Sequence, residues 1–74
     1  MNLLIVDNER STVQETEAML KFPDLGISRC FGAAYLEEAK ALILRQGIDI
    51  LLVSVELPDG SGLDLVRWIR WKRP

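Results

Sequence analysis

The sequence predicts an α/β fold in which a doubly wound parallel sheet lies between two layers of helices. Two short apolar runs, at residues 3–6 and 48–55, have the length and composition of strands buried on both faces. Between and after these runs, apolar residues recur at the spacing of amphipathic helices. Strands that alternate with helices along a chain are typical of a three-layer α/β architecture.

The first strand is followed by an expected helix at residues 11–21. Its apolar face is made of Val13, Thr16 and Leu20. Residues 22–26 read Phe-Pro-Asp-Leu-Gly, which is the composition of a turn. The next apolar segment, residues 27–31, contains Arg29, and a charged residue suits a strand at the edge of a sheet.

A second helix is expected at residues 36–46, and Gly47 is placed to end it, because glycine readily adopts the backbone conformation of a helix C-terminus. Its apolar face is made of Leu36, Ala39, Leu42 and Ile43. The strand at 48–55 follows directly, so the order of elements is preserved.

A third helix is expected after the turn at residues 58–60, which read Pro-Asp-Gly. Ser61 is placed to cap this helix, and Asp64, three residues later, completes the pattern of a capping box. The helix has an apolar face of Leu65, Val66 and Ile69.

The composition describes an ordinary soluble domain. A chain of 74 residues makes one small domain, with 49% apolar and 27% charged residues. Its net charge of -2 gives no general attraction to nucleic acid or membranes. No run of about 18 apolar residues is present, and the first residues lack the pattern of a signal peptide, so we expect a cytoplasmic protein without membrane contact.

The residue types also limit the chemistry. Cys30 is the single cysteine, which excludes an internal disulfide, and it is expected to be a buried structural residue. Histidine is absent, which removes the usual general base at neutral pH and with it Ser-His and Cys-His catalysis. We therefore do not expect an enzyme.

The connections predict where a site would lie. Right-handed crossovers and a common doubly wound order place the strands in the order 2-1-3, as in part of a flavodoxin-like sheet. Ligands then bind at the carboxyl ends of the first and third strands. Those ends carry Asp7-Asn8-Glu9 and Ser54-Val55-Glu56, so we expect these two polar clusters to meet.

The charge of these clusters favours one class of ligand. An acidic loop repels phosphate, whereas Mg²⁺ prefers carboxylate oxygens and water. A flavodoxin-like nucleotide site is disfavoured for the same reason. Equally compatible with the spacing is a purely structural role, in which Asp7 and Asn8 end the strand and begin the helix.

Two stretches of the sequence carry a family resemblance. LLIVDNE (3–9), followed by DILLVSVELPDGSGLDLV (49–66), resembles the receiver domain of response regulators. In that family a hydrophobic strand ends in an acidic pair, and a later strand carries an aspartate followed by Met or Leu, Pro and Gly at fixed spacing. The resemblance covers the whole chain and identifies residues 1–74 as a single receiver-like domain. Only the N-terminal portion of the family pattern is present, because two further strands and helices would follow.

The resemblance implies a domain that accepts a phosphoryl group on an aspartate beside a bound Mg²⁺. By this resemblance, Asp7 and Asn8 stand at the positions of the acidic pair, and Ser54 stands at the position of the phosphoacceptor aspartate. Glu56 stands at the position of the residue whose main-chain carbonyl contacts the metal. Pro58 and Gly62 stand at the loop positions that shape the turn.

Two of the three key acids are therefore replaced. The hydroxyl of Ser54 is neutral and a weak nucleophile, and no histidine is available to activate it. Asn8 removes a second charge from the metal position, so we expect no tightly bound cofactor and only a weak, vestigial magnesium site at Asp7, Asn8 and Glu56. Glu56 has the same strand parity as Ser54 and is expected to compensate in part.

These replacements predict a receiver-like module of two-component phosphorelay signalling that acts by protein contacts, without normal aspartyl phosphorylation. The resemblance implies a sensor kinase or the protein's own output domain as partner, and a parent protein that regulates transcription and contacts DNA only through that output domain. The strand from Ile48 to Val55 would have an unpaired edge, which favours self-association.

Two alternatives remain open. In one, Glu56, Glu9 or Asp7 substitutes for the lost phosphoacceptor. In the other, the C-terminal stretch RWIRWKRP binds nucleic acid through interleaved basic and aromatic residues. Basic residues near a helix C-terminus are also favoured by the helix dipole, and Arg67, Trp68 and Trp71 equally suit a surface for protein contact.

Overall fold

The computed structural model describes residues 1–20 and 26–72. The elements, in chain order, are β1 (Asn2–Val6), α1 (Arg10–Leu20), β2 (Arg29–Ala33), α2 (Leu36–Arg45), β3 (Ile50–Val53), β4 (Glu56–Leu57), β5 (Gly60–Ser61) and α3 (Gly62–Lys72). The turn expected at 22–26 and the end of the first helix at Lys21 fall outside the described residues, apart from Gly26, and so does the side chain of Leu20.

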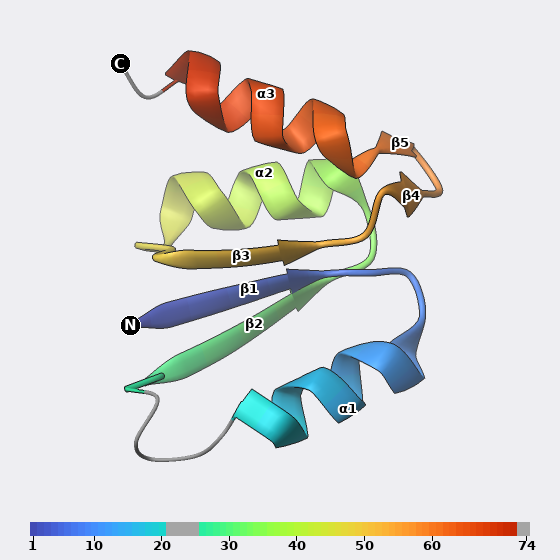
Figure 1. Cartoon of the computed structure of the whole chain (residues 1–74). Helices are drawn as coiled ribbons and strands as arrows, with labels where there is room; N and C mark the ends of the chain where they lie inside the picture. Colours follow the sequence, from blue (N-terminus) through green and yellow to red (C-terminus); the bar gives the residue numbers. More distant parts are fainter. Residues whose placement is uncertain (21–25, 73–74) are drawn as a thin grey trace.

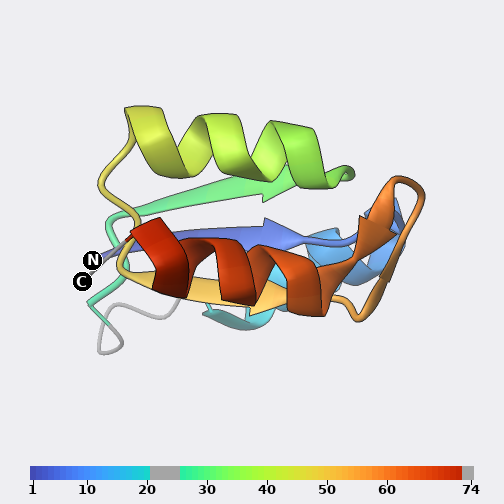
Figure 2. The same ribbon diagram turned by 90° about the horizontal axis from the view of Figure 1, so that it is seen from above.

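The predicted three-layer fold is confirmed. Strands β2, β1 and β3 form a parallel sheet in the order 2-1-3. Helix α1 covers one face of this sheet, and α2 and α3 lie side by side on the other (Figures 1 and 2).

The most buried strand in the structure is β1, because it is the central one. Leu3, Leu4 and Val6 are fully buried and Ile5 nearly so. Successive side chains of a strand point to opposite faces, so β1 faces helices on both sides. Leu4 and Val6 belong to a core cluster that also contains Ala39 of α2 and Leu65 of α3.

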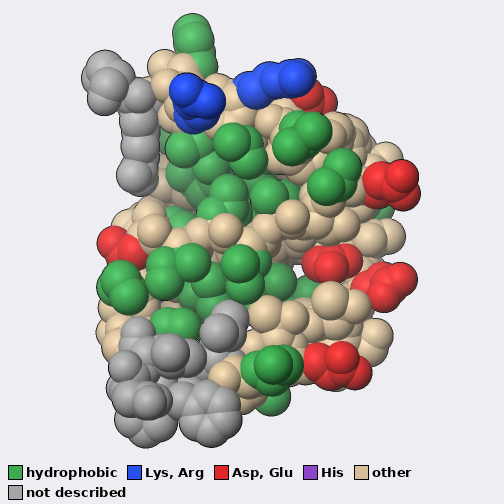
Figure 3. Space-filling model, in the orientation of Figure 1, with side chains coloured by type: hydrophobic (Ala, Val, Ile, Leu, Met, Phe, Trp, Pro, Cys, Tyr) green, Lys and Arg blue, Asp and Glu red, His purple; other side chains and the backbone are tan. Residues whose placement is uncertain are grey.

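The prediction that the strand within 48–55 is buried on both faces is wrong. Strand β3 spans only Ile50–Val53, and the side chain of Leu52 is 40% exposed. Within the described part of the chain β3 pairs only with β1, so one edge is open. Hydrophobic side chains are visible on this side of the molecule, over β3 and α3 (Figure 3).

The other boundaries differ from the predicted ones by a few residues. Strand β2 begins at Arg29, two residues later than expected, and it lies at the sheet edge as its charge predicted. Helix α2 ends at Arg45, and its C-cap residue is Gln46, one position before the expected Gly47. The backbone N–H of Gln46 donates to the Leu42 carbonyl. No helix among the described residues has the length and apolar character needed to cross a membrane.

A small hairpin between β3 and α3 was not predicted. Strands β4 and β5 pair antiparallel, with Glu56 opposite Ser61 and Leu57 opposite Gly60. The expected Pro-Asp-Gly turn is therefore the tip of a hairpin, and Gly60 adopts φ 148°, where glycine is favoured. This hairpin projects beyond the carboxyl ends of the parallel strands (Figure 1).

The predicted cap of the third helix is half confirmed. The Ser61 hydroxyl accepts a hydrogen bond from the backbone N–H of Leu63 at 3.2 Å. The Asp64 carboxylate pairs with the Arg67 guanidinium at 3.4 Å instead of reaching back to Ser61, so the reciprocal half of the capping box is missing.

We expect Ser61→Ala to lower the free energy of unfolding by about 1 kcal/mol, because the substitution leaves the Leu63 N–H without its cap. Urea denaturation followed by circular dichroism measures this change. Ser11→Ala, in an exposed position of α1, is the matched control and should change stability by less than about 0.5 kcal/mol. Equal losses in both variants would contradict the capping role.

Candidate functional site

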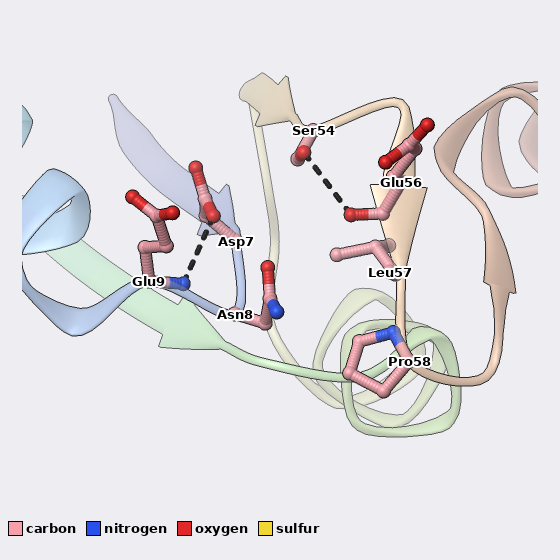
Figure 4. A pocket seen from close by; sticks show the side chains of 7 residues that line it. All are labelled: Asp7, Asn8, Glu9, Ser54, Glu56, Leu57 and Pro58. Atoms are coloured by element: carbon pink, nitrogen blue, oxygen red, sulfur yellow. Dashed lines mark hydrogen bonds between the residues drawn. The ribbon is translucent and has the colours of Figure 1, made fainter.

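An open pocket of about 540 Å³ lies at the carboxyl ends of β1 and β3 (Figure 4). Its lining residues are Asp7, Asn8 and Glu9 after β1, and Ser54, Glu56, Leu57 and Pro58 after β3. Acidic side chains gather at this end of the molecule, on the right of Figure 3. The two polar clusters singled out in the sequence therefore meet, as the strand order predicted.

The register of the sheet brings the two clusters together. Val6 pairs with Val53, and the backbone N–H of Ser54 donates to the Val6 carbonyl at 2.8 Å. On the other side of β1, the backbone N–H of Asp7 donates to the Ala33 carbonyl at 2.9 Å. Asp7 and Ser54 thus leave adjacent strands at the same level and lie on opposite sides of one pocket.

Asp7 also shapes the start of α1. Its Oδ1 accepts a hydrogen bond from the backbone N–H of Glu9 at 3.0 Å, and Glu9 Oε2 accepts one from the Thr12 hydroxyl at 3.1 Å. These short-range bonds are the ones expected of a residue that ends a strand and begins a helix. The structural role and a place in the pocket are compatible, because among the described residues these bonds use one oxygen of each carboxylate.

The Ser54 hydroxyl is engaged within its own loop. It donates to the main-chain carbonyl of Glu56 at 3.2 Å (Figure 4). This carbonyl stands at the position that the family resemblance assigns to the metal. The bond therefore occupies both the hydroxyl proton of Ser54 and one lone pair of the Glu56 carbonyl.

The pocket is acidic. The carboxylates of Asp7, Glu9 and Glu56 line it, and none of the described residues that line it is positively charged. Such a pocket repels a phosphate anion. Within residues 1–20 and 26–72, however, no three carboxylate, imidazole or thiol groups come close enough to hold a metal ion together. Mg²⁺ needs only one or two carboxylates and keeps several waters, so the weak magnesium site expected from the sequence stays a prediction.

The two loop residues singled out in the sequence have different surroundings. Pro58 lies at the exposed rim of the pocket. Gly62 is buried, and its backbone N–H donates to the Val55 carbonyl at 2.7 Å. A Cβ atom added at Gly62 would meet the backbone of Ser54, so glycine is required by the close approach of two chain segments.

Asp59 was not recognised in the sequence. From the tip of the β4–β5 hairpin its Oδ1 accepts a hydrogen bond from the backbone N–H of Leu36 at 2.7 Å, and its Oδ2 accepts one from Glu37 at 3.2 Å. It thus caps α2, where Tyr35 provides no side-chain cap. The Leu36 bond, above all, lowers the pKa of the Asp59 carboxyl from its ordinary value of 3.8.

Trp68 and Trp71 differ sharply in exposure. Trp68 is half-buried, and the ammonium groups of Lys40 and Lys72 lie 5.6 Å and 5.5 Å from its ring centroid. Trp71 is 79% exposed, and Arg67 pairs with Asp64 on the same helix. Trp68 therefore takes part in the contact between α2 and α3. Trp71 is the more exposed of the two tryptophan side chains and is accessible to a partner.

A pocket at the carboxyl ends of the first and third strands, in a parallel sheet of order 2-1-3, defines a doubly wound α/β domain of the flavodoxin-like class. The family can be stated as well. The chain belongs to the response regulator receiver domain family, whose sequence model matches residues 3–74. Receiver domains of this family are signalling modules of two-component systems.

One curated relative agrees with this assignment, and solved structures share the fold. The chain is 38% identical over 71 residues to the response regulator protein PilR of Pseudomonas aeruginosa, which covers 96% of this chain and 15% of PilR. The MaeR response regulator bound to beryllium trifluoride matches with a TM-score of 0.91 at 22% identity, over 99% of this chain and 59% of the solved MaeR chain. The non-phosphorylated receiver domain of HemR from Leptospira biflexa matches with a TM-score of 0.81 at 25% identity, over 97% of this chain and 56% of that one.

Proposed function

We propose that this receiver domain is atypical and signals through protein contacts without the usual aspartyl phosphorylation. The observation that carries the proposal is Ser54, which stands at the end of β3 where the family pattern has its phosphoacceptor aspartate. A carboxylate is already an anion and attacks a phosphoryl group directly, whereas a neutral hydroxyl needs a general base. Here the hydroxyl donates its proton to the Glu56 carbonyl, so a carbonyl oxygen and not a base is its partner.

The charge of the pocket supports the same proposal. Asn8 contributes an amide where the family pattern has a second acid, and the remaining carboxylates do not gather around one point. A phosphoryl group would therefore be repelled by the carboxylates of Asp7, Glu9 and Glu56, and none of the lining residues carries a positive charge to offset this repulsion. The beryllium trifluoride bound in the MaeR structure would meet the same obstacle here.

We expect no phosphoryl transfer when the protein is incubated with a small acyl phosphate and Mg²⁺, because Ser54 is a weak nucleophile. Intact-mass spectrometry measures the transfer, and a receiver domain that keeps the aspartate serves as positive control. Stable phosphorylation of this domain would overturn the proposal. An adduct sensitive to hydroxylamine would identify Asp7, Glu9 or Glu56 as a substitute acceptor, because hydroxylamine cleaves acyl phosphates and leaves phosphoserine intact.

The partners are also proposed from the family. We infer that the domain contacts a sensor kinase or the output domain of its own protein, that this protein is a cytoplasmic regulator of transcription, and that any DNA contact belongs to the output domain. This part rests on family analogy, since the chain spans only 15% of PilR. The open edge of β3, where Leu52 is 40% exposed, and Val55, which follows the strand and is 59% exposed, support self-association. The exposed Trp71 supports a protein contact at α3.

A further inference from the structure

The N-terminus of α2 is held by a residue from a distant part of the chain. The first backbone N–H groups of a helix have no partner inside the helix. In α2, the groups of Leu36 and Glu37 both donate to the carboxylate of Asp59, which lies 23 and 22 residues further along the chain. The residue at the N-cap position, Tyr35, makes no such bond.

An apolar contact adjoins this polar one. A Cβ atom built on Gly60 would lie only 2.7 Å from Cδ1 of Leu36, so the backbone of Gly60 packs directly on that side chain. Leu36 is itself buried. Two successive residues at the tip of the β4–β5 hairpin therefore dock on the first residue of α2, one by hydrogen bonding and one by packing.

The same hairpin forms one wall of the acidic pocket. Glu56, Leu57 and Pro58 line the pocket, and Asp59 follows them directly. With two residues in each strand, the hairpin is too short to be stable by its own pairing. Its base is held by the bonds from Ser54 to the Glu56 carbonyl and from Gly62 to the Val55 carbonyl. Its tip is held at α2.

We infer that Asp59 is a positioning residue that couples the wall of the pocket to the N-terminus of α2. While its carboxylate is ionised and bonded, the hairpin tip and the first turn of α2 move together. When these bonds are lost, the segment from Glu56 to Pro58 is released on one side. This coupling does not depend on whether the domain is phosphorylated, so it stands or falls separately from the proposed function.

The ionisation of Asp59 sets the conditions under which the coupling exists. The hydrogen bond from the backbone N–H of Leu36 lowers the pKa of the Asp59 carboxyl group most. Hydrogen bonds from the backbone N–H groups of Glu37 and of Asp59 itself, and the charge of Lys40, lower this pKa further, whereas desolvation raises it. Ionisable groups on the surrounding elements include Tyr35 at the N-cap of α2, and Glu37 and Glu38 in its first turn. Glu37 pairs with Lys40 at 3.6 Å, and Glu38 accepts a hydrogen bond from the backbone N–H of Ala34. The others are Asp64 of α3 with its partner Arg67, and Glu56 of β4. A lowered pKa means that the folded state favours the ionised carboxylate. The coupling is therefore complete above pH 3.8 and is lost as the pH falls through the lower value of the folded protein.

Amide resonances of the protein test this inference. In a pH titration by two-dimensional NMR, we expect the N–H signals of Leu36 and Glu37 to shift with a common midpoint below 3.8, and those of Glu56 and Leu57 to shift with the same midpoint. In Asp59→Asn, which has no charge at any pH and so resembles the protonated carboxyl group, this shared transition should disappear, and at neutral pH the Glu56 and Leu57 signals should lie near the low-pH positions of the natural sequence. In Asp59→Ala, the Leu36 and Glu37 amides should exchange with solvent about fivefold faster or more.

Asp64→Asn is the matched control, because it removes the same charge from an exposed neighbour on α3 and should leave the shared transition in place. If Asp59→Ala does not fold, the wild-type titration and Asp59→Asn decide the question. The inference is overturned if the Leu36 and Glu37 signals titrate without those of Glu56 and Leu57. It is equally overturned if the shared transition persists in Asp59→Asn, because another carboxylate would then be responsible.

Discussion

Gly62→Ala is expected to lower the free energy of unfolding by about 3 kcal/mol, which is a large part of the roughly 4–11 kcal/mol expected for a domain of this size. The added Cβ would meet the Ser54 carbonyl oxygen and lie 2.9 Å from both the Ser54 carbonyl carbon and Cγ2 of Val53. Backbone atoms cannot rotate out of the way as a side chain can. Relief would require α3 to move away, and Leu65, fully buried three residues later, resists that movement.

Urea denaturation of Gly62→Ala beside Gly47→Ala measures this effect. At Gly47 an added Cβ meets nothing within 4 Å and the backbone φ lies outside the left-handed region, so alanine there should be neutral or stabilise the fold by up to about 1 kcal/mol. Both substitutions add one methyl group. If the two variants unfolded at the same urea concentration, close packing of α3 on the Ser54 backbone would not be the reason for glycine at position 62.

The double variant Asn8→Asp, Ser54→Asp is expected to bind Mg²⁺ at least about tenfold more tightly than the natural sequence. Both positions line the acidic pocket, on the β1 side and on the β3 side respectively. The two substitutions would add two carboxylates to that of Asp7, and Mg²⁺ prefers such oxygen ligands. Replacing Ser54 also frees the Glu56 carbonyl from its hydrogen bond. Even 0.7 kcal/mol or so for each new carboxylate would be enough for a tenfold gain.

Isothermal titration calorimetry with Mg²⁺ measures this gain at constant ionic strength. Ser54→Asn is the control for shape, because asparagine has the size of aspartate without its charge. It should leave the affinity near that of the natural sequence. A similar affinity in the double variant and in Ser54→Asn would contradict the idea that missing charge, and not the form of the pocket, limits metal binding at this site.

These two predictions address different aspects of the same loop. The substitution at Gly62 tests how closely the loop approaches the end of β3. The substitutions at Asn8 and Ser54 test what the pocket can bind. The pocket keeps the carboxylates of Asp7, Glu9 and Glu56, and Asn8 and Ser54 contribute neutral side chains to it.

Much of the fold could be predicted because it follows from local rules. The apolar run that forms β1 and the helical periodicity of α1, α2 and α3 are properties of neighbouring residues. The handedness of the crossovers then leaves few strand orders, and it correctly brought Asp7 and Ser54 to the same pocket. The cap of α3 at Ser61 was likewise visible, because a cap acts within one turn.

The sequence by itself therefore determined the class of fold and the place where the two polar clusters meet. Only the tertiary structure decided that β3 is half exposed, that residues 56–61 form a hairpin and that Asp59 caps α2. Burial depends on how many neighbours a strand has, and an aspartate in a Pro-Asp-Gly turn gives no sign that it will bond a helix 23 residues earlier in the chain. Such contacts arise from the packing of whole elements, so no pattern of neighbouring residues encodes them.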